Sequence, residues 1–392
     1  MAFITADYIF DGHRFLPPHS IIEVDDSGVI LQLLQNDDKI EATYYNGLLM
    51  PGMINAHCHL ELSYMKGKIP PGDGLVDFLI KVIDLKKQNL QIEILNDIEI
   101  AVNEMLENGI VAVGDICNTL DTIEEKKKSK LIYHSFIECI GLDSQKADEV
   151  FERNKYLYQL FSSLHPSSIV LHAPYSISDK LIHLINQLSQ QNILSIHNQE
   201  SEEENILFEK KAGDFLKLLN KINFKIENFQ SNSKNAIHYY FEKIQNAEKI
   251  ILVHNTFTTK EDIGYVKQFN KDVFWCFCPN ANLYIENTLP NIENFIDENC
   301  NIVLGTDSLA SNHSLSIWSE ISTIRKYNPL IPVEHILKWA TYNGALALNL
   351  TSKVGQFKKG LKPGIIHIES FNKDFFNKDE KINVLYNADS SY

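Results

Sequence analysis

The chain has 392 residues, of which 44% are hydrophobic and 22% are charged, and its formal net charge is −15. This is the composition of a globular protein, and its acidic balance argues against binding to nucleic acids or to an anionic membrane surface. No basic segment precedes an apolar one at the N-terminus, and no apolar run approaches the roughly 20 residues of a membrane span. The six cysteines are scattered, which fits a reducing compartment, so we expect a cytoplasmic protein without disulfides.

Both ends of the chain contain short β-like segments that are too few to bury a core by themselves. They lie at 3–10, 21–24 and 29–34 near the N-terminus and at 364–368 and 382–386 near the C-terminus. We therefore expect both ends to pair into one small, composite β-sandwich domain. The predicted division is 1–48 and 355–392 for the two parts of this domain and 49–354 for the intervening domain.

Apolar, strand-like runs alternate with longer helix-like stretches through the middle of the chain. Nearly continuous apolar strands separated by helices indicate a parallel sheet that is covered on both faces. The number of runs, eight, is that of a (β/α)8 barrel of the TIM type. The runs are 48–54, 110–113, 131–136, 169–171, 193–196, 250–253, 273–277 and 302–304.

Polar side chains follow several of these runs, at the point where each predicted strand ends. His57 and His59 are two residues apart, so on an extended strand they point to the same side and can share one metal ion. In a parallel barrel the carboxyl ends of all strands meet at one mouth, where the active sites of this fold lie. Any single histidine is more often a core or loop residue, but a whole set in register indicates a site. The further members of the set are His172, His197, Glu200, His254 and Asp307.

The motifs around these residues resemble the amidohydrolase superfamily, and within it the branch of deaminases and chlorohydrolases that includes the S-adenosylhomocysteine, guanine and aminofutalosine deaminases. Residues 51–61 are similar to the first-strand motif, 197–201 to the His-x-x-Glu motif and 305–312 to the eighth-strand motif. Residues 343–345 and 360–364 are similar to the late helix and to the return into the β domain.

The resemblance implies one divalent metal ion, with zinc first and iron, manganese and nickel as alternatives. It further implies that His254 orients or deprotonates a water beside the metal, and that Asp307 accepts the proton of the water and passes it to leaving ammonia. Glu200 would protonate a ring nitrogen of the substrate, and His172 would contact the substrate. A purely structural alternative for Glu200 is stabilisation of the N-terminus of a helix. The implied metal ligands are His57, His59, His197 and Asp307.

The loop at 61–74 is rich in Gly and Pro and lies next to the expected metal site, so it is a candidate substrate lid. Within it, Glu61 is expected to bind an amino or ring N–H group, Tyr64 to stack on a flat heterocycle and Lys66 to meet an anionic end. Trp318 is a further candidate for the border of the pocket. The alternative is that these residues only shape the loop.

Taken with the resemblance, the sequence predicts a metal-dependent hydrolase acting on carbon–nitrogen bonds of a small molecule. The expected reaction is hydrolytic deamination of an aminated heterocycle, a purine nucleoside-like compound such as aminofutalosine. Two alternatives stay open: removal of a different leaving group, as in a chlorohydrolase or an amidine or cyclic amide hydrolase, and, more remotely, a non-catalytic scaffold. A homodimer is expected by analogy.

Overall fold

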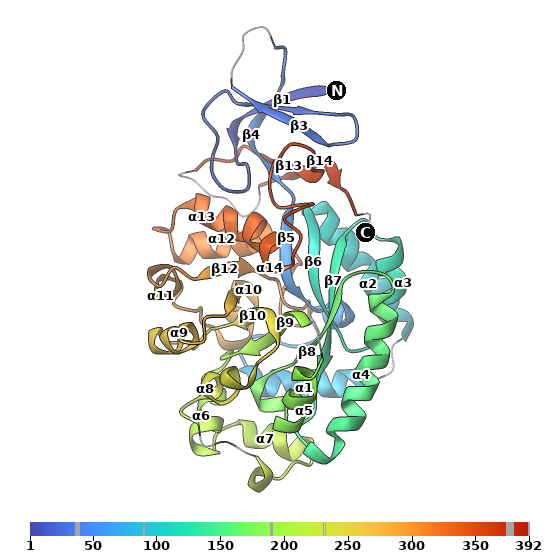
Figure 1. Ribbon diagram of the computed structural model, residues 1–392, viewed down its shortest axis with the longest axis vertical. Coiled ribbons are helices and arrows are strands. Elements are labelled where there is room, and N and C mark those ends of the chain that lie inside the picture. The colour runs from blue at the N-terminus through green and yellow to red at the C-terminus, as the bar shows by residue number, and fades with distance from the viewer. Residues whose placement is uncertain are drawn as a thin grey trace.

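Parallel strands and helices alternate through the middle of the chain in a TIM-barrel-like α/β arrangement, seen in the computed structural model in Figure 1. The structure describes residues 1–35, 40–88, 91–188, 191–229, 231, 233–373 and 380–390. Within these ranges, no helix is both long enough and apolar enough to cross a membrane.

Seven of the eight predicted barrel strands are confirmed, and the eighth, β5, begins only at the end of the predicted run 48–54. The eight strands form two four-stranded parallel sheets in the orders β5-β6-β7-β8 and β12-β11-β10-β9. The strands are β5 (Met53–Cys58), β6 (Ile110–Cys117), β7 (Ile132–Cys139), β8 (Ser167–Leu171), β9 (Gln191–Asn198), β10 (Ala247–His254), β11 (Asp272–Phe277) and β12 (Asn301–Leu304).

A few backbone hydrogen bonds connect the edge strands of the two sheets. The N–H of His197 donates to the carbonyl of His172 over 2.9 Å, which joins the ends of β8 and β9. The N–H groups of Thr306 and Asp307 both donate to the carbonyl of His57 over 3.1 Å, which joins the ends of β12 and β5. These bonds lie at the carboxyl ends of the strands, so they also fix the backbone of the predicted site.

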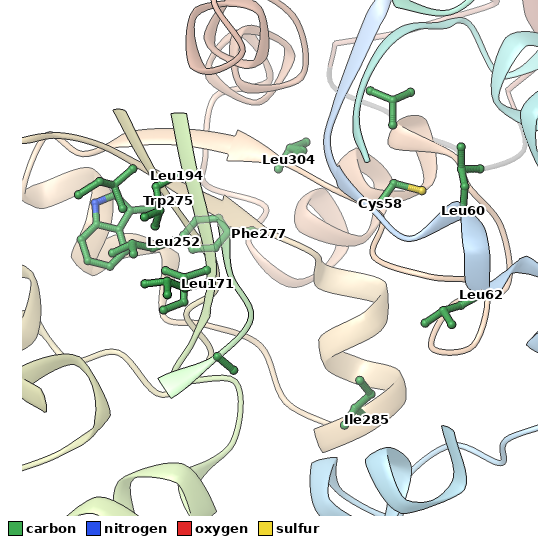
Figure 2. Packing of buried hydrophobic residues seen from close by; sticks show 14 of the residues in the cluster. Cys58, Leu60, Leu62, Leu171, Leu194, Leu252, Trp275, Phe277, Ile285 and Leu304 are labelled. Atoms are coloured by element: carbon green, nitrogen blue, oxygen red, sulfur yellow. The ribbon is translucent and has the colours of Figure 1, made fainter. Parts of the chain in front are cut away.

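Both faces of the barrel strands are buried, as the sequence predicts. Along β10, Ile250 and Leu252 belong to one buried cluster, whereas Ile251 and Val253 belong to another. Figure 2 shows the first cluster, in which Leu252 packs near Trp275. Alternation between two apolar layers is the pattern of a parallel sheet covered by helices.

Helices follow the barrel strands and cover the sheets. The α-helices are α1 (Leu75–Lys86), α2 (Gln91–Glu107), α3 (Ile123–Lys128), α4 (Ala147–Ser162), α5 (Asp179–Asn186), α6 (Glu202–Lys210), α7 (Phe215–Lys221), α8 (Ala236–Tyr240), α9 (Lys260–Lys267), α10 (Pro279–Glu286), α11 (Ile292–Asp297), α12 (Ile317–Tyr327), α13 (Val333–Lys338) and α14 (Gly344–Ala347). The short 3-10 helices are η1 (Leu60–Met65), η2 (Ser144–Lys146), η3 (Pro174–Ser176), η4 (Ile226–Asn228) and η5 (Phe241–Lys243), and η6 (Trp339–Asn343) is a π-helix.

Strands from both ends of the chain form one six-stranded sheet, in the order β14-β13-β4-β1-β2-β3. Figure 1 shows the blue N-terminal and red C-terminal strands next to one another. The pairing of the two ends was expected, but a sandwich needs a second layer, and the described residues place these strands in a single sheet. The strands are β1 (Ala2–Ile9), β2 (Ile21–Val24), β3 (Ile30–Leu34), β4 (Thr43–Pro51), β13 (Pro363–Glu369) and β14 (Ile382–Ala388).

The apolar run before His57 belongs to two strands rather than one. It divides at Gly52, between β4 of the terminal sheet and β5 of the barrel. A side chain at Gly52 would place its Cβ only 2.2 Å from Cγ1 of Val111, so only glycine fits this crossing point.

Candidate metal centre and active site

Four side chains from three strand ends converge at the carboxyl end of the barrel. His57 is at the end of β5, His59 follows it, His197 is at the end of β9, and Asp307 follows β12. All four are buried, and their ligand atoms lie within 4.8 Å of one another. The structure therefore brings together the four predicted metal ligands.

The distances within this group are those of metal ligands. Nε2 of His59 lies 3.1 Å from Nε2 of His57, 3.3 Å from Nε2 of His197 and 3.4 Å from Oδ1 of Asp307, and Nε2 of His57 lies 3.5 Å from the same Oδ1. A tetrahedral ion with bonds of about 2.0–2.1 Å separates its ligand atoms by about 3.3–3.4 Å. Nε2 of His59 can carry only one proton, so it cannot donate a hydrogen bond to all three of these neighbouring atoms. A cation bound between the four atoms would satisfy all of them.

The protonation states of these residues also suit a metal. Burial lowers the pKa of His57, and burial holds the pKa of His59 and of His197 well below the usual range, so the three rings are neutral. Burial raises the pKa of Asp307, but the hydrogen bond with His57 and the nearby rings of His59 and His254 outweigh burial and leave this pKa well below normal. Neutral imidazoles and a carboxylate are the forms that bind divalent ions.

Two of the ligands are held from behind by a second partner. Nδ1 of His197 lies 2.8 Å from the carbonyl oxygen of His172, which makes Nδ1 the protonated nitrogen and leaves Nε2 with its lone pair. Ser311 donates its hydroxyl to Oδ2 of Asp307, so Oδ1 is the oxygen that faces the histidines. Nothing in the sequence pattern singles out Ser311 for this role.

His254, at the end of β10, lies beside the ligand group with one ring nitrogen fixed. Its ring stacks on His197 with centroids 5.4 Å apart, and its Nδ1 lies 3.0 Å from Oδ1 of Asn282 on α10. Nδ2 of the same amide faces the backbone oxygen of His254, so Oδ1 is the acceptor and Nδ1 carries the proton. Nε2 then has a lone pair and is buried without a hydrogen-bond partner among the described residues. Burial lowers the pKa of His254, so the ring is neutral.

Two residues of the site, His254 and Asp307, have a backbone in the left-handed region, with φ of 73° and 57°. Non-glycine residues adopt this conformation at a cost of about 1–3 kcal/mol, and such residues cluster at functional sites. Asp307 is held there by its N–H bond to His57, and Asn255, next to His254, is held by an N–H bond to Asn198.

Glu200 lies at the opposite side of His254 from Asn282. Its Oε1 is 3.6 Å from Nε2 of His254, and its side chain is buried. Burial raises the pKa of Glu200 well above the usual range, so it is a protonated acid at neutral pH. The helix-start role belongs instead to Glu204, which completes a capping box with Ser201 at the beginning of α6.

A cavity of about 440 Å³ opens beside the ligand group, within the size range of small-molecule sites. Its polar end contains His59, His172, His197, Glu200, His254 and Asp307, together with Glu138, Asn118 and Lys86. The opposite walls are apolar and come mainly from α1 and α7, which pack against each other. The sequence patterns gave no reason to select Glu138 or Lys86, because neither belongs to a motif.

Of the predicted substrate-binding residues, His172 lines this cavity, whereas Glu61, Tyr64 and Trp318 lie outside its lining. Oε2 of Glu61 accepts hydrogen bonds from the backbone N–H groups of Asn118 and Thr119, at 2.8 and 3.1 Å. Tyr64 is buried in η1, and Trp318 is buried in α12 near Phe371.

The loop at 61–74 is packed rather than suspended over the cavity. Lys66 pairs with Glu104, 3.3 Å away, and the N–H of Gly72 donates to the carbonyl of Tyr284 over 2.8 Å. From this loop only Leu62 lines the cavity, and the wall expected from a lid is supplied by α1.

Comparisons with known proteins agree with this site. An adenosine deaminase of Helicobacter pylori is 29% identical over 356 residues, which cover 88% of this chain and 84% of that protein. A 5-methylthioadenosine/S-adenosylhomocysteine deaminase of Pyrococcus horikoshii is 26% identical, over 83% of this chain and 74% of that protein. The crystal structure of Helicobacter pylori aminofutalosine deaminase in complex with methylthio-coformycin matches with a TM-score of 0.78 and 24% identity, over 96% of this chain and 94% of that chain.

The sequence model of the Amidohydrolase family matches residues 48–386, which include every strand of the barrel and the four ligand residues. The motif resemblance is thus confirmed over most of the chain. The chain belongs to the amidohydrolase family and is a hydrolase of carbon–nitrogen bonds.

Proposed function

We propose that the protein is a hydrolytic deaminase that releases ammonia from the aminated ring of an adenosine-like nucleoside. The observation that carries this proposal is the buried acid Glu200, 3.6 Å from the unprotonated Nε2 of His254, on the wall of a cavity that also contains the four ligand atoms. An acid and a base side by side are what ring protonation and water activation require. The deaminases among the relatives support the same reaction.

For the cofactor we propose one zinc ion held by the predicted ligand set. Three neutral imidazoles and one carboxylate suit zinc, and iron, manganese or nickel are the alternatives that such ligands accept. When bound, the ion would lower the pKa of a water molecule and polarise it for attack. The proposed ligands are His57, His59, His197 and Asp307.

His254 is the group that we propose to take the proton from the attacking water. Its Nε2 has a lone pair because Asn282 holds the proton on Nδ1. Asp307 has Oδ1 directed at the histidines and Oδ2 bonded to Ser311, so it serves first as a ligand. The proton then passes from His254 to the amino group, which leaves as ammonia with the electron pair of the carbon–nitrogen bond. Asp307 accepts the second proton of the former water as the new carbonyl forms, and releases it to solvent.

Glu200 supplies the other proton. Its protonated carboxyl donates to a ring nitrogen next to the carbon that carries the amino group, which makes that carbon more electrophilic. After ammonia leaves, the protonated ring nitrogen keeps the hydrogen, and Glu200 recovers a proton from solvent. An open-chain amide has no ring nitrogen to protonate, so the position of Glu200 favours a heterocycle.

The shape of the cavity supports a substrate with a polar and an apolar end. The reactive ring would lie at the polar end, near Glu200 and His254, and the remote substituent would lie against Phe78 and Leu79 of α1 and Leu218 of α7. An apolar wall favours an uncharged substituent over a charged one.

The test is ammonia release by the zinc-loaded protein from aminopurines, adenosine derivatives, aminopteridines and aminopyrimidines. Release from one class, abolished in Glu200→Gln and in His57→Ala, is the expected result. Metal-loaded protein that releases no ammonia from any of them contradicts the proposal, and the same compounds with chloride or amide leaving groups then become the next substrates.

Two structural predictions accompany this proposal. We propose residues 49–354 as the catalytic domain, with 1–48 and 355–392 as the accessory β unit, and limited proteolysis at the joins tests it. We also propose that two copies associate, and light scattering of the metal-loaded protein at several concentrations tests that prediction.

A further inference from the structure

Glu138, at the end of β7, is a buried carboxyl group that has only one of its two oxygens bonded. It is 2% exposed, and its Oε2 accepts a hydrogen bond from Nδ2 of Asn118 over 3.0 Å. Its Oε1 has no hydrogen-bond partner in the described part of the chain, although the residue lines the cavity. A buried polar oxygen left unpaired is unfavourable, so this oxygen is expected to meet a ligand.

The nearest polar atom does not satisfy this oxygen. Nδ1 of His197 is 3.5 Å from Oε1, but its proton points to the carbonyl of His172, which is closer at 2.8 Å. Glu138, His172 and His197 form a second group of possible metal ligands, but His197 has no lone pair left on Nδ1. Only Glu138 and His172 would remain as ligands, which is too few for a stable cation site.

His172 presents an acceptor next to Glu138. Its Nδ1 lies 2.6 Å from Oγ of Ser176, and that hydroxyl donates its own proton to the carbonyl of Ala173 over 2.9 Å. Ser176 must therefore accept from Nδ1, which leaves Nε2 of His172 unprotonated. One ring nitrogen of His172 and one oxygen of Glu138 lie within 4.8 Å of each other.

An acceptor on His172 beside an unpaired carboxyl oxygen of Glu138 requires a ligand with two neighbouring polar groups. One of these groups donates to His172, and the other exchanges a hydrogen bond with Glu138. Adjacent hydroxyl groups on a sugar provide such a pair, because each hydroxyl can both donate and accept. Lys86, which lines the same end of the cavity, can donate to such a hydroxyl. A cationic ligand is disfavoured, because the charge of Lys86 and a bound metal ion would repel it.

We infer that Glu138 and His172 bind the vicinal hydroxyl pair of the substrate sugar, so that Glu138 is a specificity-determining residue for ribonucleosides. The inference rests on the proposed nucleoside deamination and adds to it a place for the sugar. With the hydroxyls at β7 and β8, the base lies toward Glu200 beyond β9, and the remaining substituent lies toward the apolar walls of α1 and α7.

The experiment compares kcat/KM for ammonia release from an adenosine-like ribonucleoside and from its 2′-deoxy, 3′-deoxy and 2′,3′-dideoxy forms. The zinc-loaded wild type is expected to prefer the ribonucleoside over the dideoxy form by about 10²-fold or more, since a site built to bind hydroxyls discriminates strongly against their loss. Glu138→Leu has a similar volume but no oxygen, so it removes the hydrogen bond with the sugar hydroxyl whether or not the carboxyl group is ionised. This variant is expected to lose at least about tenfold of the preference.

Leu79→Ala is the matched control, because it alters the apolar wall of the same cavity without touching Glu138 or His172. Its kcat/KM is expected to change by the same factor for every sugar, so that the preference is kept. Metal content and melting temperature show whether each variant is folded and loaded, and the wild-type series is decisive even if Glu138→Leu does not fold.

The outcomes separate the two proposals. Ammonia release without preference for the ribonucleoside in the wild type, or an unchanged preference in folded Glu138→Leu, overturns the sugar assignment and leaves deamination standing. No ammonia from any nucleoside overturns the proposed function, and the sugar assignment with it.

Discussion

The side-chain oxygen of Asn282 lies 3.0 Å from Nδ1 of His254 and links α10 to the end of β10. This contact decides which nitrogen of His254 can act as a base. Asn282→Ala removes it and is expected to lower kcat by about 10–100-fold, as is typical for partners of active-site histidines. Asn282→Asp keeps an acceptor at the same place and should retain more activity. Steady-state kinetics with metal analysis checks this, and equal losses in the two variants would contradict the assigned tautomer.

Removal of a ligand should remove the metal. His57 contributes Nε2 to the ligand group and is fully buried, so His57→Ala leaves an incomplete site. We expect the purified variant to bind far less than one zinc per chain and to lose deaminase activity, whereas chelation of the wild type should be reversed by added zinc. His183→Ala, in an exposed contact with Gln187 on α5, is the control. A variant at His57 that keeps a full metal content would exclude the proposed ligand set.

The pH profile should report the acid Glu200. Because burial raises the pKa of Glu200, its proton is present at neutral pH, and kcat/KM should fall as the pH rises through that pKa. Glu200→Gln should lower the rate by about 10²–10⁴-fold with the metal still bound, and its residual activity should lack this alkaline limb. Glu202→Gln, an exposed neighbour, should behave like the wild type. An unchanged alkaline limb in Glu200→Gln would assign that limb to another group.

Stability should also depend on pH through Glu204. Burial raises the pKa of Glu204 to about 8, and its Oε2 has no hydrogen-bond partner among the described residues, so it can hold a proton. The folded state then binds a proton that the unfolded chain has released, and the free energy of unfolding decreases as the pH rises toward 8.

Buried histidines oppose this effect only below about pH 6.5, the usual pKa of histidine in an unfolded chain. Urea unfolding between pH 6.5 and 8.5 therefore isolates the carboxyl groups. We expect Glu204→Gln to reduce the slope by up to about 1.4 kcal/mol per pH unit relative to the wild type. Glu202→Gln on the same helix serves as the reference, and a wild-type slope in Glu204→Gln would show that Glu204 is ionised in the folded state.

A buried ion pair supports the first metal-binding turn. Nζ of Lys126 on α3 lies 2.6 Å from Oδ2 of Asp115 on β6, with both side chains fully buried, and Oδ1 of Asp115 accepts the N–H of Leu60, next to His59. Lys126→Met leaves a buried carboxylate without its partner, so a loss of about 3–5 kcal/mol in the free energy of unfolding is expected.

Lys127→Met, on the exposed side of the same helix, should change stability by less than about 0.5 kcal/mol. Denaturant titration of both variants compares them. Equal stabilities would mean that the Lys126–Asp115 pair contributes nothing beyond helix propensity.

The positions of most strands could be predicted because apolar runs of four to eight residues indicate buried strands. The run at 250–253 corresponds to β10, and the segment at 21–24 corresponds to β2. The division of the run before His57 could not be predicted, because it depends on how closely Gly52 approaches Val111, residues that are distant in sequence. The single terminal sheet, in place of a sandwich, likewise depends on pairing between β4 and β13.

The sequence by itself determined the residues that follow the strands: the histidine pair at 57 and 59, and His197, His254 and Asp307. Their identity and spacing are properties of the chain, and a parallel barrel brings the carboxyl ends of its strands together independently of the conformation of the loops. Only the tertiary structure decided what surrounds them. The positions of Asn282 behind His254 and of Glu138 beside His172 depend on the packing of separate elements. Hydrogen bonds between distant residues leave no local pattern in a single sequence, so these partners, and the wall formed by α1 in place of a lid, emerge only when the chain is folded.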